Sequence, residues 1–327
     1  MSERLVLALN RVGSNLEPEA AILNPLGIRV EYASDDSDRR TRQLNQAEAV
    51  LLNTTTVDAA FFEIASTCRV IVTYGVGYDH IDLEEAHRRG VMVANVPDYC
   101  TEEVADHTMA LMLAVARGIG RGDALVRGGG WGVEAVGQLH RLRGRIMGLV
   151  GFGRIARAVA ARARAFGLIV VAYDPLFLHA TKVDGSVGLV DSVGALFVAS
   201  DIVSLHLPLS LETRGVIGAQ AIRQMKPGAI VINTSRGALI DLPALLEALD
   251  DGRLAGAGLD VFPNEPPNPK LLSRPNLVVT PHVAYYSMES EWELKESAAR
   301  AIGAALTGAP VPNQLTAATS VEKELVG

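Results

Sequence analysis

The sequence predicts an α/β fold built on parallel β-sheets. Short apolar runs recur along its 327 residues, and stretches of helical length separate most of them. Strands that are apolar throughout are buried on both faces, and their alternation with helices is typical of parallel sheets. A chain of this length predicts about two domains. The expected strands are Leu5–Leu9, Ala49–Leu52, Val70–Thr73, Val91–Ala94, Ile146–Val150, Ile169–Ala172, Ile202–Leu205, Ala229–Ile232, Gly256–Leu259 and Leu277–Thr280.

The boundary between the two domains is expected in the proline-containing segment Val96–Cys100. The helix that follows has Glu102 and Glu103 in its first turn, where acidic side chains favour the helix dipole. The segment Gly118–Gly144 is rich in Gly and Arg and predicts a loop with a short helical piece. The last helix is expected to return to the first domain, which makes that domain discontinuous. Helices are expected at Thr101–Arg117, Leu242–Leu249 and Glu291–Leu306.

The overall charge argues against a nucleic-acid or membrane surface. The net charge is −7, whereas nucleic acids and anionic membranes require basic patches. No apolar run reaches the roughly 18 to 20 residues that span a bilayer. Residues 1–9 contain an acidic residue and an apolar stretch that is too short for a signal peptide. We therefore expect a cytoplasmic protein, with Cys68 and Cys100 as reduced thiols.

A dinucleotide-binding loop is expected after the strand Ile146–Val150. Gly151 permits a tight turn, Gly153 lets the backbone approach a pyrophosphate, and Ala156 allows the next helix to pack closely on the strand. The start of that helix offers N–H groups to phosphates. Asp174 lies about 20 residues further on, where an acid can bind the ribose hydroxyls and repel a 2′-phosphate. This pattern favours NAD over NADP, although Asp174 alone also fits a simple turn after a strand.

Polar side chains follow three successive strands of the second half of the chain. Arg236 comes after Ala229–Ile232, Asp260 and Glu265 come after the next expected strand, and His282 comes after the last one. Because ligands of such sheets bind beyond the carboxyl ends of the strands, we expect these groups at one rim. Singly, each residue has a simpler explanation: a surface arginine, a solvated glutamate or a histidine that caps a strand end.

Together, these residue types suit hydride transfer to and from an acid. Oxidation of a secondary alcohol needs a base for the hydroxyl proton, and histidine titrates in the required range. A carboxylate on the other ring nitrogen fixes the tautomer, and an arginine can bind a substrate carboxylate through two hydrogen bonds. The remaining histidines show no metal-ligand spacing, so no metal is expected.

Several motifs resemble the signatures of the D-isomer-specific 2-hydroxyacid dehydrogenases. They are Gly151-Phe-Gly-Arg-Ile-Ala, Asn233-Thr-Ser-Arg-Gly, Leu259-Asp-Val-Phe-Pro-Asn-Glu-Pro and Thr280-Pro-His-Val-Ala. The resemblance extends from Tyr74-Gly-Val-Gly-Tyr-Asp to the C-terminal helix, and within the family it is to the branch that contains the C-terminal-binding-protein corepressors. That branch often has Arg where this chain has Thr73 and Trp where it has Tyr285, which leaves the substrate open.

The resemblance implies a flavodoxin-like substrate domain, a Rossmann NAD-binding domain and a homodimer. The boundaries we expect are 1–98 with 284–327 for the substrate domain and 99–283 for the NAD-binding domain. His282 would be the acid/base, Glu265 its partner, and Arg236 the anchor of the substrate carboxylate and carbonyl. The backbone of Gly75, Val76 and Gly77 would hold the same carboxylate, and Tyr285 can line the pocket. The residues expected to bind the cofactor are Thr108, Gly151, Phe152, Gly153, Arg154, Ile155, Asp174, Leu207, Thr213, Thr234 and Asp260.

The expected function is hydride transfer between NAD(H) and a small 2-hydroxy or 2-oxo acid, D-specific by resemblance. Two alternatives stay open. One is a non-enzymatic NAD(H) sensor that binds a protein partner, as the corepressors do. The other is a phosphite or formate dehydrogenase, because both anions can use the same arginine and histidine.

Overall fold

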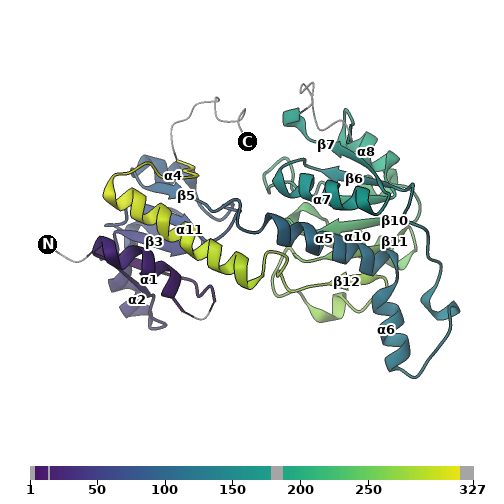
Figure 1. The fold of residues 1–327 in the computed structure, drawn as a ribbon, viewed down its shortest axis with the longest axis horizontal. Helices are drawn as coiled ribbons and strands as arrows, with labels where there is room; N and C mark the ends of the chain where they lie inside the picture. Colours follow the sequence, from purple (N-terminus) through teal and green to yellow (C-terminus); the bar gives the residue numbers. More distant parts are fainter. Residues whose placement is uncertain (1–3, 14, 178–186, 317–327) are drawn as a thin grey trace. The chain divides into compact units, whose positions relative to one another are not determined.

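The chain folds into two compact α/β units, which confirms the predicted fold class. A computed structural model describes residues 4–13, 15–177 and 187–316. One unit takes in Met1–Cys100 and Tyr286–Gly327, and the other takes in Thr101–Tyr285 (Figure 1). The chain therefore leaves the first unit once and returns to it at its end.

The first unit is built on a five-stranded sheet in the order β2-β1-β3-β4-β5, with every neighbouring pair parallel. Strand β2 was not predicted, because its residues Ile28-Arg-Val-Glu-Tyr alternate apolar and polar side chains instead of forming an apolar run. It is an edge strand, so only one of its faces needs to be apolar. The strands are β1 Arg4–Ala8, β2 Ile28–Tyr32, β3 Ala49–Leu52, β4 Val70–Thr73 and β5 Met92–Ala94.

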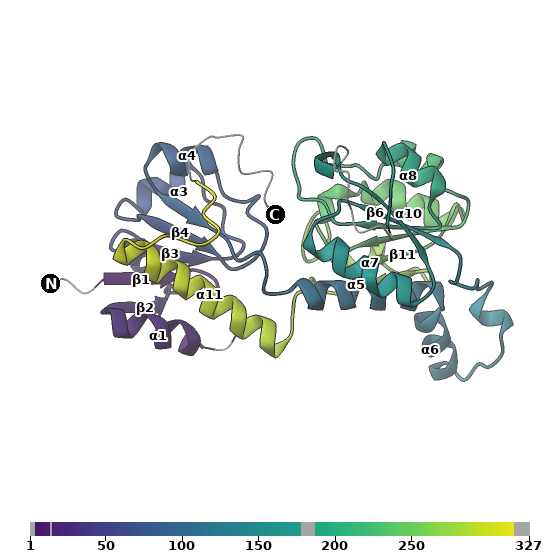
Figure 2. The same cartoon turned by 45° about the horizontal axis from the view of Figure 1, so that its top comes forward.

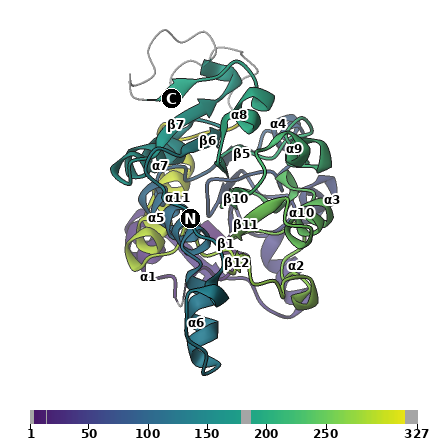
Figure 3. The same cartoon turned by 90° about the vertical axis from the view of Figure 1, so that its right-hand side faces the viewer.

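Helices cover both faces of this sheet. Helix α11, from the end of the chain, packs against α1 and β4, and Figures 1 and 2 show it alongside α1. Figure 3 shows α2, α3 and α4 on the other side of the sheet, where Phe61 and Phe62 are buried with Ile71. The expected return of the last helix is thus observed. The helices are α1 Glu17–Leu23, α2 Ser37–Leu44, α3 Ala59–Ile64, α4 Leu83–Arg88 and α11 Met288–Thr307.

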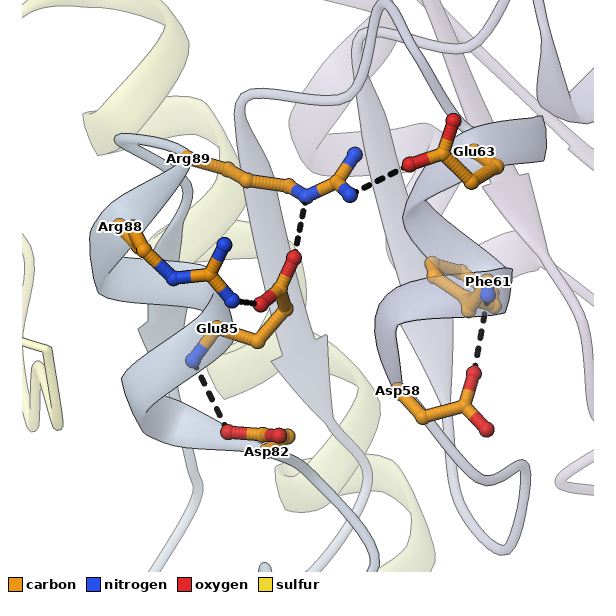
Figure 4. A network of polar contacts seen from close by, with 7 residues as sticks. All are labelled: Asp58, Phe61, Glu63, Asp82, Glu85, Arg88 and Arg89. Carbon is orange, nitrogen blue, oxygen red and sulfur yellow. Dashed lines mark hydrogen bonds and ion pairs between the residues drawn. The ribbon is translucent and has the colours of Figure 1, made fainter.

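Short helices in this unit are held at their ends by acidic side chains. Asp58 accepts a hydrogen bond from the third residue of α3, and Asp82 does the same for α4 (Figure 4). The buried Glu85 forms ion pairs with Arg88 and Arg89, and Arg89 also reaches a glutamate on α3. Caps contribute about 0.5–2 kcal/mol each, so these contacts fix helices that are too short to be stable alone.

The second unit is built on a seven-stranded parallel sheet in the order β12-β11-β10-β9-β6-β7-β8. The seven strands include every one expected in this part of the chain, with ends shifted by at most two residues. Strand β8 was not predicted, because two residues at the sheet edge leave no pattern. The strands are β6 Ile146–Val150, β7 Ile169–Tyr173, β8 Gly188–Leu189, β9 Ile202–Leu205, β10 Ala229–Asn233, β11 Leu254–Leu259 and β12 Leu277–Val279.

Two apolar layers sandwich this sheet. One layer joins α5 and α7 to the strands through residues such as Met112 and Val159, and the other joins α8, α9 and α10 through residues such as Phe197 and Leu245. None of the helices in the described ranges is both long and apolar enough to cross a membrane. The helices are α5 Thr101–Ala116, α6 Ile119–Arg127, α7 Arg154–Ala165, α8 Val193–Ala199, α9 Ala219–Gln224 and α10 Leu242–Asp250.

Helix α6 is the helical piece expected within residues 118–144. It spans nine residues, and a 3-10 turn follows at Glu134–Val136. No residue of α6 is buried within the described chain, and its apolar residues Ile119 and Val126 are exposed.

Candidate active site

The glycine loop joins β6 to α7 in a conformation that needs its glycines. Gly151 has φ +91, and a Cβ there would lie 2.6 Å from the carbonyl oxygen of His206. A Cβ on Gly153 would meet no atom of the described chain within 4 Å, so this backbone is open to a ligand. Gly153 is also the N-cap of α7 and provides no side chain to its N–H groups. The helix start can therefore bind an anion such as a pyrophosphate.

Asp174 connects the end of β7 to this loop. One carboxylate oxygen accepts a hydrogen bond from the backbone N–H of Phe152 at 2.8 Å, and the other accepts one from Leu176 at 3.0 Å. The turn contact and a ribose contact are compatible, because a carboxylate can accept about four hydrogen bonds. The acid expected to select NAD thus lies directly beside the glycine loop.

Other expected cofactor residues form local contacts at the ends of strands. The buried hydroxyls of Thr108 on α5 and Thr234 after β10 lie 2.8 Å apart. Thr213 donates to the carbonyl of Pro208 at 2.8 Å, which closes the loop that follows β9. Leu207 lies half-buried at the start of the same loop.

His282 and Glu265 form the central contact of the site. His282 Nδ1 lies 2.7 Å from Glu265 Oε2, and the N–H of Phe262 donates to Glu265 Oε1 at 2.9 Å. Burial opposes ionisation of Glu265, but these two hydrogen bonds and the charges of His282 and Arg236 outweigh it and lower its pKa. An ionised carboxylate only accepts hydrogen bonds, so Nδ1 carries the proton. The opposite nitrogen, Nε2, remains for proton exchange.

The turn that carries His282 is held by the buried carboxylate of Asp260. His282 has φ +55, a left-handed conformation that is unusual for a residue with a side chain. Its N–H donates to the Asp260 carbonyl at 2.8 Å, and the N–H groups of Val283 and Ala284 each donate to an Asp260 carboxylate oxygen at 2.9 Å. Thr280 adds a hydroxyl at 2.6 Å. Asp260 therefore fixes the backbone conformation of the turn that carries His282.

His107 completes this support and was not singled out by the sequence. Its Nε2 lies 2.9 Å from the hydroxyl of Thr280 and 3.7 Å from Asp260. The imidazole comes from the middle of α5, far along the chain from the strand ends that guided the search. Only the tertiary packing of α5 on β11 and β12 brings these groups together.

Arg236 reaches the same region through a close backbone approach. A Cβ on the next residue, Gly237, would lie 1.9 Å from the carbonyl carbon of Phe262. The turn after β10 therefore lies directly on the loop that carries Glu265. Arg236 donates to the carbonyl of Ser235 at 2.9 Å, and its charge contributes to lowering the pKa of Glu265.

The first unit contains a separate backbone site at Gly75–Gly77, after β4. The carbonyl of Gly75 accepts from Val96 at 3.1 Å, and the carbonyl of Val76 accepts from the amide of Asn95 at 2.7 Å. Both carbonyls are thus engaged. The N–H groups of Val76 and Gly77, by contrast, donate to no group in the described ranges. Two adjacent free N–H groups suit a carboxylate. Asn95 directly follows β5, so the rule that found Arg236 and His282 could have found it as well.

Tyr285 lies close to His282 within the second unit. Its ring centroid is 6.3 Å from that of His282, with the two planes nearly perpendicular. Over the residues that the structure describes, no cluster of three or more His, Cys, Asp or Glu side chains is arranged to hold a metal ion.

The fold and the site define a dehydrogenase that uses a dinucleotide. A glycine turn, an acid after the next strand and an Arg–Glu–His set lie at the carboxyl ends of one parallel sheet. The chain belongs to the D-isomer specific 2-hydroxyacid dehydrogenase family, whose NAD binding domain matches residues 109–284. This finding confirms the family inferred from the motifs.

Relatives and solved structures agree with this membership. A glyoxylate reductase of Thermococcus litoralis is 42% identical over 271 residues, 81% of this chain and 82% of that protein. A hydroxypyruvate reductase of Thermotoga maritima is 37% identical over 287 residues, 86% of this chain and 92% of that protein. A D-lactate dehydrogenase from Aquifex aeolicus, solved with NAD and lactic acid, has a TM-score of 0.83 and 28% identity, covering 93% of this chain and 96% of that one. The protein is thus an oxidoreductase of CH–OH groups with a nicotinamide dinucleotide as its cofactor.

Replacing Gly237 with Ala should disturb the site through the backbone. The new Cβ would overlap the Phe262 carbonyl group, and relief requires the loop that carries Glu265 to move. We expect a loss of about 1–3 kcal/mol of unfolding free energy, as for an overpacked core, and a lower kcat/KM. Thermal unfolding and turnover would be measured. In the control Gly194→Ala, the nearest atom is a side-chain oxygen of Gln224 at 3.4 Å, so both quantities should stay near wild type; equal stability of the two variants would contradict the close approach.

Proposed function

We propose that this protein transfers a hydride between NAD(H) and C2 of a small 2-hydroxy or 2-oxo acid, with His282 as the acid/base. The observation that carries this proposal is the 2.7 Å contact between His282 and an ionised Glu265. The names of the relatives support the substrate class, since glyoxylate, hydroxypyruvate and lactic acid are all small 2-oxo or 2-hydroxy acids.

Each residue of the set has a distinct role in reduction of the oxo acid. The dinucleotide, when bound, supplies the hydride that adds to C2. His282 gives the proton on Nε2 to the carbonyl oxygen, and the charge of Glu265 stabilises the imidazolium that precedes this transfer. Arg236 binds the substrate carboxylate and polarises the carbonyl. In oxidation, the neutral imidazole takes the hydroxyl proton instead.

The first unit is proposed to bind the substrate. Residues 1–98 and 284–327 would form this domain, and residues 99–283 would bind NAD. The N–H groups of Val76 and Gly77, beside Gly75, would donate hydrogen bonds to the substrate carboxylate, and Tyr285 would line the pocket near C2. Fixing the carboxylate, the C2 oxygen and the side from which hydride arrives makes the reaction specific for one hand, which by resemblance is D.

The second unit is proposed to hold NAD along the carboxyl ends of its strands. Gly151 and Gly153 would approach the pyrophosphate, and Asp174 would bind the adenosine ribose. The fit is supported by the open backbone at Gly153 and by the position of Asp174 beside the loop. The other residues proposed along the cofactor are Thr108, Phe152, Arg154, Ile155, Leu207, Thr213, Thr234 and Asp260.

A substrate panel tests the proposed reaction. Purified protein should oxidise NADH with glyoxylate, hydroxypyruvate or another small 2-oxo acid. Turnover with phosphite or formate, and none with 2-oxo or 2-hydroxy acids, would select the anion dehydrogenase. NADH binding with no turnover on any of these compounds would select the sensor. The reductases among the relatives favour a 2-hydroxyacid dehydrogenase over the anion dehydrogenase and the sensor.

His282 and Glu265 should control different parts of the pH profile. His282→Gln should lower turnover by roughly 10² to 10⁴, the usual contribution of a positioned acid/base. Glu265→Gln keeps the hydrogen bond but removes the negative charge that favours the imidazolium. Since reduction needs the imidazolium, the alkaline limb of reduction should move to lower pH. Rates across pH, with NADH binding followed by fluorescence as the control, check both; an unmoved limb would remove Glu265 from this role.

NAD should be preferred over NADP by at least about tenfold in kcat/KM, on the order of 1.4 kcal/mol. The charge of Asp174 would face the 2′-phosphate of NADP. Asp174→Asn keeps an acceptor for the N–H of Phe152 but removes the charge, so the preference should shrink. Paired kinetics with both cofactors measure the ratio, and equal use of NADP by the wild type would contradict the proposal.

We also propose a homodimer that buries α6 and the segment after it. Ile119 and Val126 on α6 are exposed, and Trp131 beyond it is 89% exposed. Large apolar side chains gathered in this way mark interfaces. Light scattering should give twice the mass of the chain, and Ile119→Lys with Val126→Lys should give the monomer. Val198→Lys, on the exposed side of α8, should leave the dimer intact, and a monomeric wild type would reject the assembly. The cytoplasmic location stays a prediction.

A further inference from the structure

The buried carboxyl group of Glu19 is hydrogen-bonded to Tyr74, the residue that precedes the backbone site of the first unit. Glu19, on α1, is fully buried, and Tyr74, directly after β4, is 2% exposed. The Tyr74 hydroxyl donates to Glu19 Oε1 at 2.6 Å. Neither residue belongs to the chemistry proposed above, and both are far from each other in sequence. Their contact fixes the end of β4 to α1.

This contact is not an obvious source of stability. Burial raises the pKa of Glu19 even though the Tyr74 hydroxyl and Lys295 oppose the shift, and burial together with Glu19 raises the pKa of Tyr74. Glu19 Oε2 and the hydroxyl of Tyr32 have no hydrogen-bond partner in the described ranges. A buried polar atom without a partner costs about 1–3 kcal/mol, and an apolar pair would fill the same space without that cost.

Helix α11 closes the cluster from the other side. The Lys295 side chain is 3% exposed and donates to the carbonyl of Asn15 at 2.5 Å. Its charge lowers the cost of a carboxylate at Glu19. The returning helix therefore supplies the cation that this buried acid needs, and it packs on α1 and β4.

Tyr74 directly precedes Gly75–Gly77, the loop proposed to bind the substrate carboxylate. Tyr74 N donates to the carbonyl of Leu52 at 2.6 Å, and its side chain is held by Glu19. The next two carbonyls are held by Val96 and Asn95. Hydrogen bonds of the side chain and the backbone thus hold the loop at Tyr74, Gly75 and Val76. The direction of the N–H groups that follow depends on all of them.

We infer that Tyr74 is a positioning residue that acts through Glu19: their bond sets the direction in which the N–H groups of Val76 and Gly77 meet the substrate carboxylate. This inference rests on the proposed function. It assigns the buried pair to affinity for the carboxylate, because the loop contributes no group to proton transfer or to the cofactor. Loss of the bond should therefore raise KM and leave kcat largely unchanged.

The test compares two tyrosines of the same cluster. Tyr74→Phe removes the hydroxyl that bonds to Glu19 and keeps the ring. Tyr32→Phe removes a buried hydroxyl that has no partner in the described residues and is not part of the loop. With glyoxylate as substrate, Tyr74→Phe should raise KM, and the Ki for oxalate, by about tenfold. Its kcat should stay within about twofold. Tyr32→Phe should leave KM, Ki and kcat near wild type.

Replacements of Glu19 give the same test from the other end of the bond. Glu19→Gln keeps an acceptor for the Tyr74 hydroxyl and should retain a KM close to wild type. Glu19→Met removes the acceptor at similar size and should raise KM as Tyr74→Phe does; it also serves if Tyr74→Phe does not fold. Thermal unfolding of every variant separates lost stability from altered binding.

The outcomes distinguish this inference from the function on which it rests. A wild type without turnover on any 2-oxo acid would reject the proposed function. Turnover by the wild type with an unchanged KM in Tyr74→Phe and Glu19→Met would reject the inference alone. An equal rise of KM in Tyr32→Phe would also reject it, because the effect would then belong to packing of the cluster. Faster amide exchange at residues 75–77 in Tyr74→Phe, but not in Tyr32→Phe, would support it.

Discussion

The parallel pairing of β10, β11 and β12 is the constraint on which the candidate active site depends. Neighbouring parallel strands end at one edge, so groups far apart in sequence meet there. Arg236, Glu265 and His282 follow these strands in turn. The edge alone does not set the orientation of these side chains, however. The Asp260 carboxylate fixes the turn around His282 by accepting hydrogen bonds from its N–H groups, and Gly237 allows the loop after β10 to contact the loop that carries Glu265.

The sequence predicted the elements whose patterns are set by burial on both sides. The central strands were found because an apolar run is required there, and the three residues proposed for catalysis were singled out because they follow such runs. Strand β2 was missed since its apolar and polar residues alternate, whereas α6 fits the short helical piece expected in its segment. The support of His282 by His107 depends on packing of α5, which no local pattern encodes. Cofactor roles rested on family resemblance, because open glycine backbone carries little signal by itself.

The anion sites proposed for the two units rely on the same physical feature, backbone N–H groups that no side chain covers. In the second unit, Gly151 turns the chain so that the start of α7 presents N–H groups, and Gly153 adds no side chain to cover them. In the first unit, Val96 and Asn95 hold the carbonyls of Gly75 and Val76, and the N–H groups of Val76 and Gly77 donate to no other group in the described ranges. Backbone donors held in this way need little reorganisation when the anion arrives, which is the advantage of a preorganised polar site.

The two carboxyl groups at the centre of these sites show how burial divides their tasks. Glu265 is 38% exposed on its side chain and receives two hydrogen bonds beside Arg236, and its pKa is lowered. Such a group stays ionised as its neighbour gains and loses a proton, so it can stabilise a changing charge. Glu19 is fully buried, and its pKa is raised. A buried carboxyl group with a raised pKa is poorly suited to stabilise a changing charge. Its short hydrogen bond to Tyr74, however, allows little movement. The same side chain is therefore suited to the proposed proton transfer at one site and to the inferred positioning role at the other.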